Sequence, residues 1–410
     1  MKPGKPGINL ERLKRNLTEL SRFGRQEEGG ITRQSFGEAD RQARAWLVDL
    51  IRDSGLRPGI DEAGNVFGRL GPDGPAVLAG SHIDTVPQGG RFDGALGVLA
   101  ALECMQTIRE KNLPIRRPLE VVAFSDEEGA YCSFLGSRAL TGRLSPDELS
   151  RAENGEGHCL VDAMRKCGLD VTRVGLARRE PGEILAYLEL HIEQGPQLES
   201  CQVPLGIVRS IVGIASYWVT FTGEADHAGT TPLSMRKDAF LGAAEFSLAV
   251  HERIRSGSRG VVTVGNVLLS PGAFNIVPRV ARLALEFRES SQERLKEMEE
   301  EILEIGGRIA RERNLGFTAE RVSWDPPVRL SRRVQRILRD EADALGYPYR
   351  LMDSGAGHDA QVLSLKTDAG MIFVPSLGGK SHCPEEDSRW EDIEKGAQLL
   401  LSALLHLANE

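Results

Sequence analysis

The stretch 80–94, GSHIDTVPQGGRFDG, is the part of the sequence that most constrains how this chain can fold. An apolar run at 76–79 leads into it, and a helical pattern over 95–111 follows it directly. A strand, a glycine-rich turn and a helix in this order predict that His82 and Asp93 lie at the carboxyl end of a strand. In a parallel α/β sheet this edge is where ligands and ions are held.

Further strands and helices alternate along the first half of the chain. Short apolar strands are expected at 119–125 and 185–192, and amphipathic helices at 10–20 and 43–51. This alternation predicts an α/β fold with a mostly parallel, doubly wound sheet. A chain of 410 residues also exceeds the usual size of one hydrophobic core, so two domains are expected.

The pattern changes near residue 213. A strand that alternates with period two, a helix, two strands, a helix and a final strand occupy 213–326 and predict an inserted α+β domain with an antiparallel sheet. The segment Asp325-Pro326-Pro327 ends the last of these strands, and after it the alternation of helices and strands seen in the first half of the chain returns. We therefore expect one domain made of residues 1–212 and 327–410, interrupted by the insertion.

Composition excludes several classes of protein. A net charge of -8 argues against nucleic acid as a partner. No apolar stretch approaches the length of a membrane span, so no membrane partner is expected. The six cysteines are scattered without a CxxC pair, which is typical of a reducing compartment, and the protein is expected to be cytoplasmic.

His82 and Asp84 lie two residues apart at the expected strand end, where both side chains project from one face. If one ring nitrogen of His82 binds a metal, the Asp84 carboxylate is well placed to accept the hydrogen of the other. An H-x-D pair alone is a weak signal. Asp93, after the glycine turn, strengthens it.

The acidic segment 126–129, DEEG, follows another apolar strand. It can be a solvated turn, or its neighbouring carboxylates can divide the work of ligating a metal and acting as a general base. His191 lies near the end of the predicted strand 185–192, and His382 lies in a loop that follows another predicted strand. Either one alone suits a core or loop position. Two further histidines beside these carboxylates make a coherent ligand inventory for two metals.

The chain resembles the M20 metallopeptidase superfamily, and within it the amidase branch of N-carbamoyl-L-amino acid amidohydrolases, allantoate amidohydrolases and β-ureidopropionases. The resemblance extends over nearly the whole chain. It is carried, in order, by GSHIDTVPQGGRFDG at 80–94, FSDEEG at 124–129, ELHIEQGPQLE at 189–199, ADHAGTTP at 225–232, FNIVP at 274–278, SGAGHDA at 354–360 and SHCPEE at 381–386.

The resemblance implies a role for each matching residue. Two divalent metal ions would be bound, with Asp93 bridging them, Glu127 as the general base and Asp84 as the carboxylate behind His82. Zinc is favoured, and manganese, cobalt or nickel also suit such ligands. The implied metal ligands are His82, Asp93, Glu128, His191 and His382.

The insertion would be a ferredoxin-like lid and dimerisation domain of a homodimer. Its His227 would reach the partner subunit's active site and help to hold the oxyanion, while Gln194, Asn275 and Arg288 would contact substrate, with Arg288 suited to a carboxylate. The residues alone do not require this. His227 and Asn275 also read as turn residues, and Arg288 as half of a surface ion pair.

The reaction implied is hydrolysis of the ureido C–N bond of an N-carbamoyl-L-amino acid, a small-molecule ureido acid, to the L-amino acid, ammonia and carbon dioxide. Allantoate hydrolysis is the main alternative, because both substrates carry a ureido group near a carboxylate. A peptidase and a catalytically inactive metal-binding homologue are weaker alternatives, the latter because a structural metal site needs no Glu127. A nucleotide-binding protein is excluded, since both GxGxxG and GxxxxGK[ST] are missing.

Overall fold

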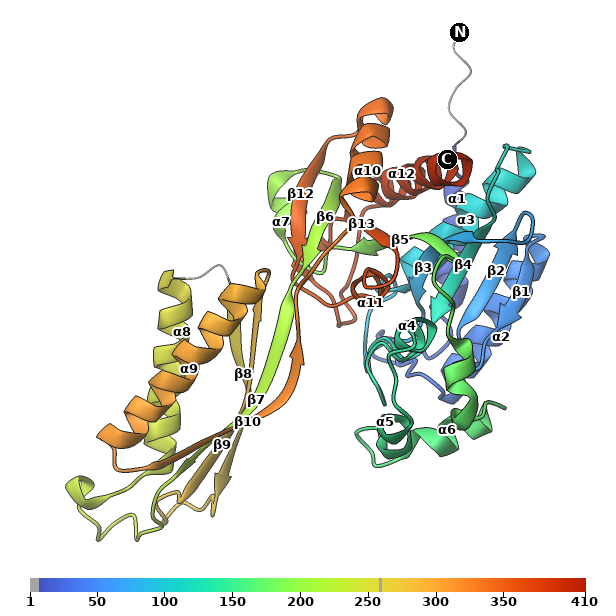
Figure 1. Cartoon of the computed structure of the whole chain (residues 1–410). Coiled ribbons are helices and arrows are strands. Elements are labelled where there is room, and N and C mark those ends of the chain that lie inside the picture. The colour runs from blue at the N-terminus through green and yellow to red at the C-terminus, as the bar shows by residue number, and fades with distance from the viewer. Residues whose placement is uncertain (1–6, 258–259) are drawn as a thin grey trace. The chain divides into compact units, whose positions relative to one another are not determined.

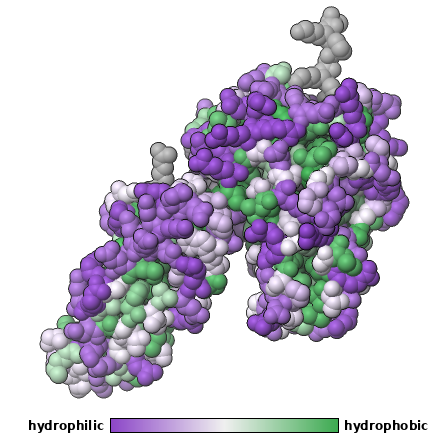
Figure 2. Space-filling view, in the orientation of Figure 1, coloured by the Kyte–Doolittle hydropathy of each residue, from purple (hydrophilic) through white to green (hydrophobic). Residues whose placement is uncertain are grey.

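The computed structural model describes residues 7–257 and 260–410 and divides them into two compact units. The first unit combines the described residues up to Arg209 with Arg329–Glu410, and the second is Ser210–Val328. Hydrophilic residues cover most of the visible surface of each unit, and smaller hydrophobic patches interrupt this surface (Figure 2). No helix in the described part of the chain is long and apolar enough to cross a membrane, and all six cysteines are free thiols.

The first unit is built on a nine-stranded sheet in the order β1-β2-β4-β3-β5-β13-β6-β11, with β12 paired to β6 (Figure 1). Its centre, β4-β3-β5-β13, is parallel, whereas β2 and β6 run antiparallel to it. This mainly parallel sheet confirms the predicted α/β class. The strands are β1 Arg57–Ile60, β2 Val66–Leu70, β3 Ala76–His82, β4 Leu119–Phe124, β5 Ile184–Ile192, β6 Leu205–Ile211, β11 Val328–Arg329, β12 Tyr349–Ser354 and β13 Asp368–Val374.

Helices α1, α2, α3, α10 and α12 share one apolar core with the sheet, and this core includes Leu188 and Leu190 of β5. Side chains alternate across a strand, so Glu189 lies on the opposite face, where α11 packs against β5 and β13. The bounds are α1 Leu10–Leu20, α2 Glu38–Asp53, α3 Ala95–Glu110, α4 Leu135–Thr141, α5 Pro146–Arg151, α6 Leu160–Lys166, η1 Val171–Ala177, α7 Gln197–Cys201, α10 Arg332–Leu345, α11 Asp359–Leu363, η3 Leu377–Gly379 and α12 Trp390–Asn409.

The register of the parallel strands aligns the ends that carry the predicted site. His82 at the end of β3 lies opposite Phe124, the last residue of β4. His191 of β5 lies opposite Phe373 of β13 in the same way. The carboxyl ends of four neighbouring strands therefore reach one edge, and the loops that follow them can meet there.

The second unit is a four-stranded antiparallel sheet in the order β10-β7-β9-β8. Alternate residues of β7 and β9 are buried, because helices α8 and α9 cover one face of the sheet and share its core. The order strand, helix, two strands, helix, strand is the one predicted. The bounds are β7 Gly213–Thr222, η2 Leu233–Met235, α8 Ala239–Gly257, β8 Val261–Ser270, β9 Val280–Glu289, α9 Gln292–Glu312 and β10 Gly316–Asp325.

Candidate metal centre

His82 ends β3 and is almost fully buried. Its Nδ1 lies 3.0 Å from the carbonyl oxygen of Asp84, which can only accept, so Nδ1 carries the hydrogen. The lone pair of Nε2 is therefore free to bind a cation. The carboxylate Oδ1 of Asp84 is 3.7 Å from Nδ1, while its Oδ2 accepts a hydrogen bond from the amide of Glu128 at 3.1 Å. Asp84 thus links the ends of β3 and β4.

Asp93 stands in the loop between β3 and α3, just before the helix N-cap Gly94. Gly94 has φ 61°, and a Cβ built there would lie 2.5 Å from the His82 ring. Only glycine lets the loop pass so close to the histidine. Because residue 94 is glycine, the loop can place Asp93 beside the ends of the strands.

The three acidic residues after β4 have different roles. Asp126, with φ 53°, turns its carboxylate back to accept hydrogen bonds from the amides of residues 130–132, so it shapes the loop. Burial, with a smaller contribution from the charge of Asp84, raises the pKa of Asp126 to about 7. Glu127 and Glu128 instead extend toward His82, and Oε2 of Glu127 lies 3.5 Å from His82 Nε2.

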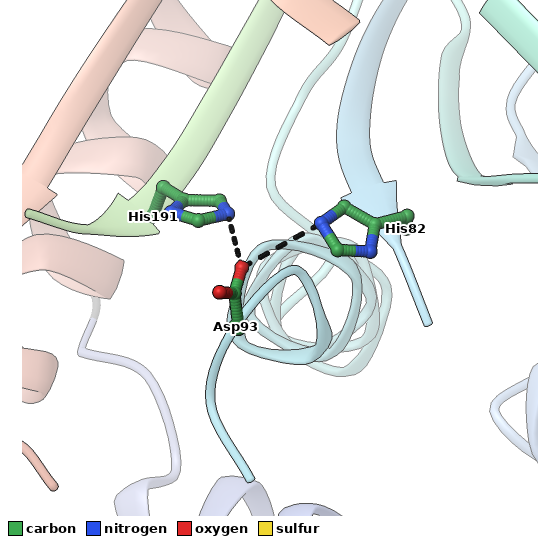
Figure 3. A group of neighbouring side chains, drawn as sticks. All are labelled: His82, Asp93 and His191. Atoms are coloured by element: carbon green, nitrogen blue, oxygen red, sulfur yellow. Dashed lines mark ion pairs between the residues drawn. The ribbon is translucent and has the colours of Figure 1, made fainter. Parts of the chain in front are cut away.

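His191, near the end of β5, has the same arrangement as His82. Its Nδ1 donates to the carbonyl of Ile192 at 2.9 Å, and its Nε2 lies 3.2 Å from Oδ1 of Asp93. Burial opposes the charged ring, but the hydrogen bond to Asp93 and the charges of Asp93 and Glu189 together outweigh it and raise the pKa of His191 to about 9. Figure 3 shows the rings of His82 and His191 directed at the same carboxylate oxygen.

The second oxygen of Asp93 faces a different set of side chains. Oδ2 lies 3.2 Å from Nε2 of His382 and accepts a hydrogen bond from Nε2 of Gln194 at 2.8 Å. His382 is in turn 3.6 Å from Oε1 of Glu128. A carboxylate whose two oxygens face separate ligand groups can bridge two cations.

The chemistry of this donor set fits divalent metal ions. Four groups among the described residues could hold an ion; the fourth is Glu189 with His191 and His358, and the other three contain Asp93 or His82. Burial, followed by the neighbouring carboxylates, raises the pKa values of Glu127 and Glu128 well above their usual range, and a cation among them would relieve this cost. The other three groups are His82 with Asp93 and His191, His82 with Glu127 and Glu128, and Asp93 with Glu128 and His382.

Glu386 supports the centre and was missed by the sequence reasoning. Its Oε1 accepts hydrogen bonds from the amides of Phe92 and Asp93 at 2.9 and 3.1 Å. Its Oε2 lies 2.8 Å from the hydroxyl oxygen of Ser381, which is also 2.9 Å from Oδ2 of Asp93, so the two carboxylates share the one hydroxyl hydrogen. One carboxylate therefore joins the loop of Asp93 to the loop of His382. Glu386 lies in the motif SHCPEE, but the two backbone amides that it accepts from are almost 300 residues away in the sequence.

A second layer behind His191 was also missed. The ring of His358 lies 4.6 Å from that of His191, and burial, then the charge of His191, lower the pKa of His358 well below its usual value. Glu189 is buried beside them and accepts hydrogen bonds from Ser81 and from the amide of Ala360. The His358 ring therefore packs edge-on against the His191 ring, and Glu189 ties β3 to the start of α11 beside them.

The structure brings together all the candidate residues of the first unit. Those of the second unit lie in two places. His227 and Asn275 are neighbours, since the amide of Ala228 donates to the carbonyl of Asn275 at 3.0 Å. Arg288 lies near the other end of β9, opposite Ile214 of β7, and its Nε donates to Glu286 at 2.9 Å.

Comparisons with known proteins show the family of this chain. The profile of Peptidase family M20/M25/M40 matches residues 78–406. The chain is 42% identical over 408 residues to an N-carbamoyl-L-amino acid amidohydrolase from Geobacillus stearothermophilus, covering 98% of this chain and 99% of the relative. It is 34% identical to an allantoate amidohydrolase from Escherichia coli K12, covering 97% of both.

A solved structure is similar over the same extent. An amidase of the hydantoinase/carbamoylase family from Burkholderia multivorans matches with a TM-score of 0.90 and 31% identity, covering 99% of this chain and 100% of the other. The matching family profile, the sequence identity and the shared fold lead to one conclusion. The chain belongs to peptidase family M20/M25/M40 and, within it, to the amidase branch of hydrolases that act on C–N bonds in linear amides.

Proposed function

We propose that this enzyme hydrolyses the ureido C–N bond of N-carbamoyl-L-amino acids, taking up water and releasing the L-amino acid, ammonia and carbon dioxide. The observation that carries the proposal is the position of Glu127. It is a buried carboxylate 3.5 Å from a histidine of the centre, and it stands outside the two groups that share Asp93. The relative that is 42% identical over nearly its whole length supports the choice of substrate.

Two divalent ions would be held by the residues around Asp93. One would lie among His82, Asp93 and His191, and the other among Asp93, Glu128 and His382. Such ions supply Lewis-acid polarisation of the substrate carbonyl and lower the pKa of water. Zinc suits this set of imidazole and carboxylate donors, and manganese, cobalt and nickel remain alternatives.

Glu127 would accept the proton of the attacking water at its carboxylate and return it to the leaving nitrogen. The raised pKa of Glu127, caused first by burial and next by Glu128, favours a group that can hold a proton during the reaction. Asp84 would fix the position of Glu128 through its hydrogen bond to that residue's amide. Gln194, whose Oε1 is buried and has no hydrogen-bond partner among the described residues, would contact substrate.

The second unit would act as a lid and as the dimerisation domain of a homodimer. His227 would donate to the oxyanion in the partner subunit, while Asn275 and Arg288 would bind the substrate carboxylate. Support comes from the loops around His227, where Leu233 and Met235 are 80% and 70% exposed and Phe274 is fully exposed. Exposed apolar side chains around a polar residue are typical of a contact surface. The cytoplasmic location expected from the sequence stays a prediction.

The test is ammonia release by metal-reconstituted enzyme on N-carbamoyl-L-methionine and, in parallel, on allantoate. We expect turnover of the first substrate and a loss of at least about a hundredfold in kcat for Glu127→Gln, which keeps the shape of the side chain but cannot accept a proton. Turnover of allantoate alone would keep the base and overturn the substrate, and the 34% identical relative makes this the second candidate. An unaltered rate in Glu127→Gln would contradict the role of Glu127.

A further inference from the structure

His227 begins a turn that fixes which of its ring nitrogens carries the hydrogen. Its Nδ1 lies 3.0 Å from the amide nitrogen of Gly229 and 3.2 Å from that of Thr230, and both amides donate to it. A backbone amide can only donate, so Nδ1 must offer its lone pair. The neutral ring therefore carries its hydrogen on Nε2, the nitrogen that does not face the turn.

Arg236 holds this turn from the side. Its Nη2 donates to the carbonyl of Ala228 at 2.5 Å, and its Nε donates to the carbonyl of Thr231 at 3.0 Å. The amide of Thr231 donates in turn to the carbonyl of His227 at 3.2 Å. One guanidinium thus ties together both ends of the segment that presents the Gly229 and Thr230 amides.

The chain on the other side of the turn is also fixed. Residues 226–228 lie beside the loop of Asn275, with a hydrogen bond from the amide of Val277 to the carbonyl of Asp226 at 2.8 Å and a bridge between His227 and Ile276. The backbone before the ring is held by this loop, and the backbone after the ring is held by Arg236.

We propose that Arg236 is a positioning residue, which holds residues 228–231 so that two amides keep His227 as an Nε2–H donor. The consequence for catalysis rests on the proposed function. An oxyanion is stabilised by a donor, whereas the other tautomer would present a lone pair of Nε2 to it and repel it. The tautomer itself follows from the turn and needs no assumption about substrate.

The first measurement is the nitrogen-15 NMR spectrum of the ring nitrogens in the full-length protein, with His227→Asn identifying the signals of this ring. We expect the neutral ring to show a protonated Nε2 and an unprotonated Nδ1. A neutral ring with its hydrogen on Nδ1, or an equal mixture of the two tautomers, would overturn the proposal whatever the activity of the enzyme.

The second measurement compares three variants. In Arg236→Ala we expect mixed tautomers of His227 and a kcat lower by roughly tenfold to a hundredfold, with metal content unchanged, because the donor is no longer held in place. Arg236→Lys keeps the charge but cannot reach both carbonyls, so it should fall between Arg236→Ala and the unaltered enzyme. Lys237→Ala is the matched control, since it removes the adjacent cation, whose ion pair with Glu224 is exposed.

The outcomes separate this inference from the proposed function. If Arg236→Ala and Arg236→Lys are folded by circular dichroism and keep the tautomer of the unaltered protein, Arg236 does not position His227. If the tautomer shifts in these variants but no ureido substrate is turned over by any of the proteins, the proposed function fails and the positioning role stands.

Discussion

Asp93 is the residue on which the centre depends, because its two oxygens face different side chains. Burial of Asp93 opposes its charge, but hydrogen bonds to His191 and His382, together with the charges of neighbouring histidines, outweigh it and hold the pKa of Asp93 well below its usual range. Its orientation is set by Ser381, which donates to Oδ2, and by Glu386, which accepts from its amide. Outer contacts of this kind orient a ligand and tune its affinity for metal.

Replacing Glu386 tests this support. In Glu386→Ala the amides of Phe92 and Asp93 lose their acceptor, so the Asp93 loop loses its anchor, and we expect metal affinity to fall about 10-fold to 100-fold. The measurement is calorimetric titration of the metal-free protein with Zn²⁺. Glu385→Ala, at an exposed position, is the control. Equal affinities in the two variants would show that Glu386 does not support the centre.

Among the elements, β8 is unusual. It has ten residues, it pairs only with β9 among the described residues, and it contains no lysine, arginine or proline. Natural edge strands are normally protected by such residues or covered by another part of the assembly. The exposed apolar side chains of β8 include Val267, Leu268 and Leu269. This edge therefore favours β8 as the surface covered by the second copy in the proposed homodimer.

A charge on β8 tests that surface. Leu268 is 49% exposed, and Leu268→Lys should shift the protein from dimer to monomer, because a buried unpaired ammonium opposes association. Analytical ultracentrifugation at several concentrations gives the oligomeric state. Val322→Lys is the control, because Val322 is 60% exposed on the opposite edge strand β10. Dissociation by the control alone would place the interface on β10 instead.

At the scale of the whole molecule, the proposed active site needs both units and two copies of the chain. The described residues of the first unit supply the candidate metal ligands and Glu127, while His227 belongs to the second unit. If His227 acts in the partner's site, each subunit contributes a donor to a reaction that it does not itself complete. Assembly would then be a condition for turnover.

Mixing two inactive variants tests this exchange. A subunit with His227→Ala keeps its own Glu127, and a subunit with Glu127→Ala keeps its own His227. Random reassembly should restore about a quarter of the normal specific activity, because half of the dimers are mixed and each mixed dimer has one complete site. The assay follows ammonia release after the dimers are dissociated and reassociated. Mixed dimers without activity would show that His227 does not act across the interface.

Much of the fold and of the first unit's site could be predicted from local patterns. Apolar runs followed by glycine or acidic residues marked the ends of β3 and β4, and parallel strands bring such ends to one edge. The strands β1, β6, β11 and β12 were missed. β1 and β11 have only four and two residues, which leave little periodicity to read, whereas charged residues interrupt the apolar pattern of β6 and β12. Glu386 and His358 were missed because their partners are distant in sequence.

The sequence by itself determined which groups the chain has available: imidazoles and carboxylates at strand ends, and a glycine at position 94. The sequence could not determine the role of each of these side chains. Asp126 and Glu127 are adjacent in sequence, yet one caps a loop and the other faces the metal centre. Only the tertiary structure decided this, because a carboxylate's role depends on the donors and charges that long-range packing places around it.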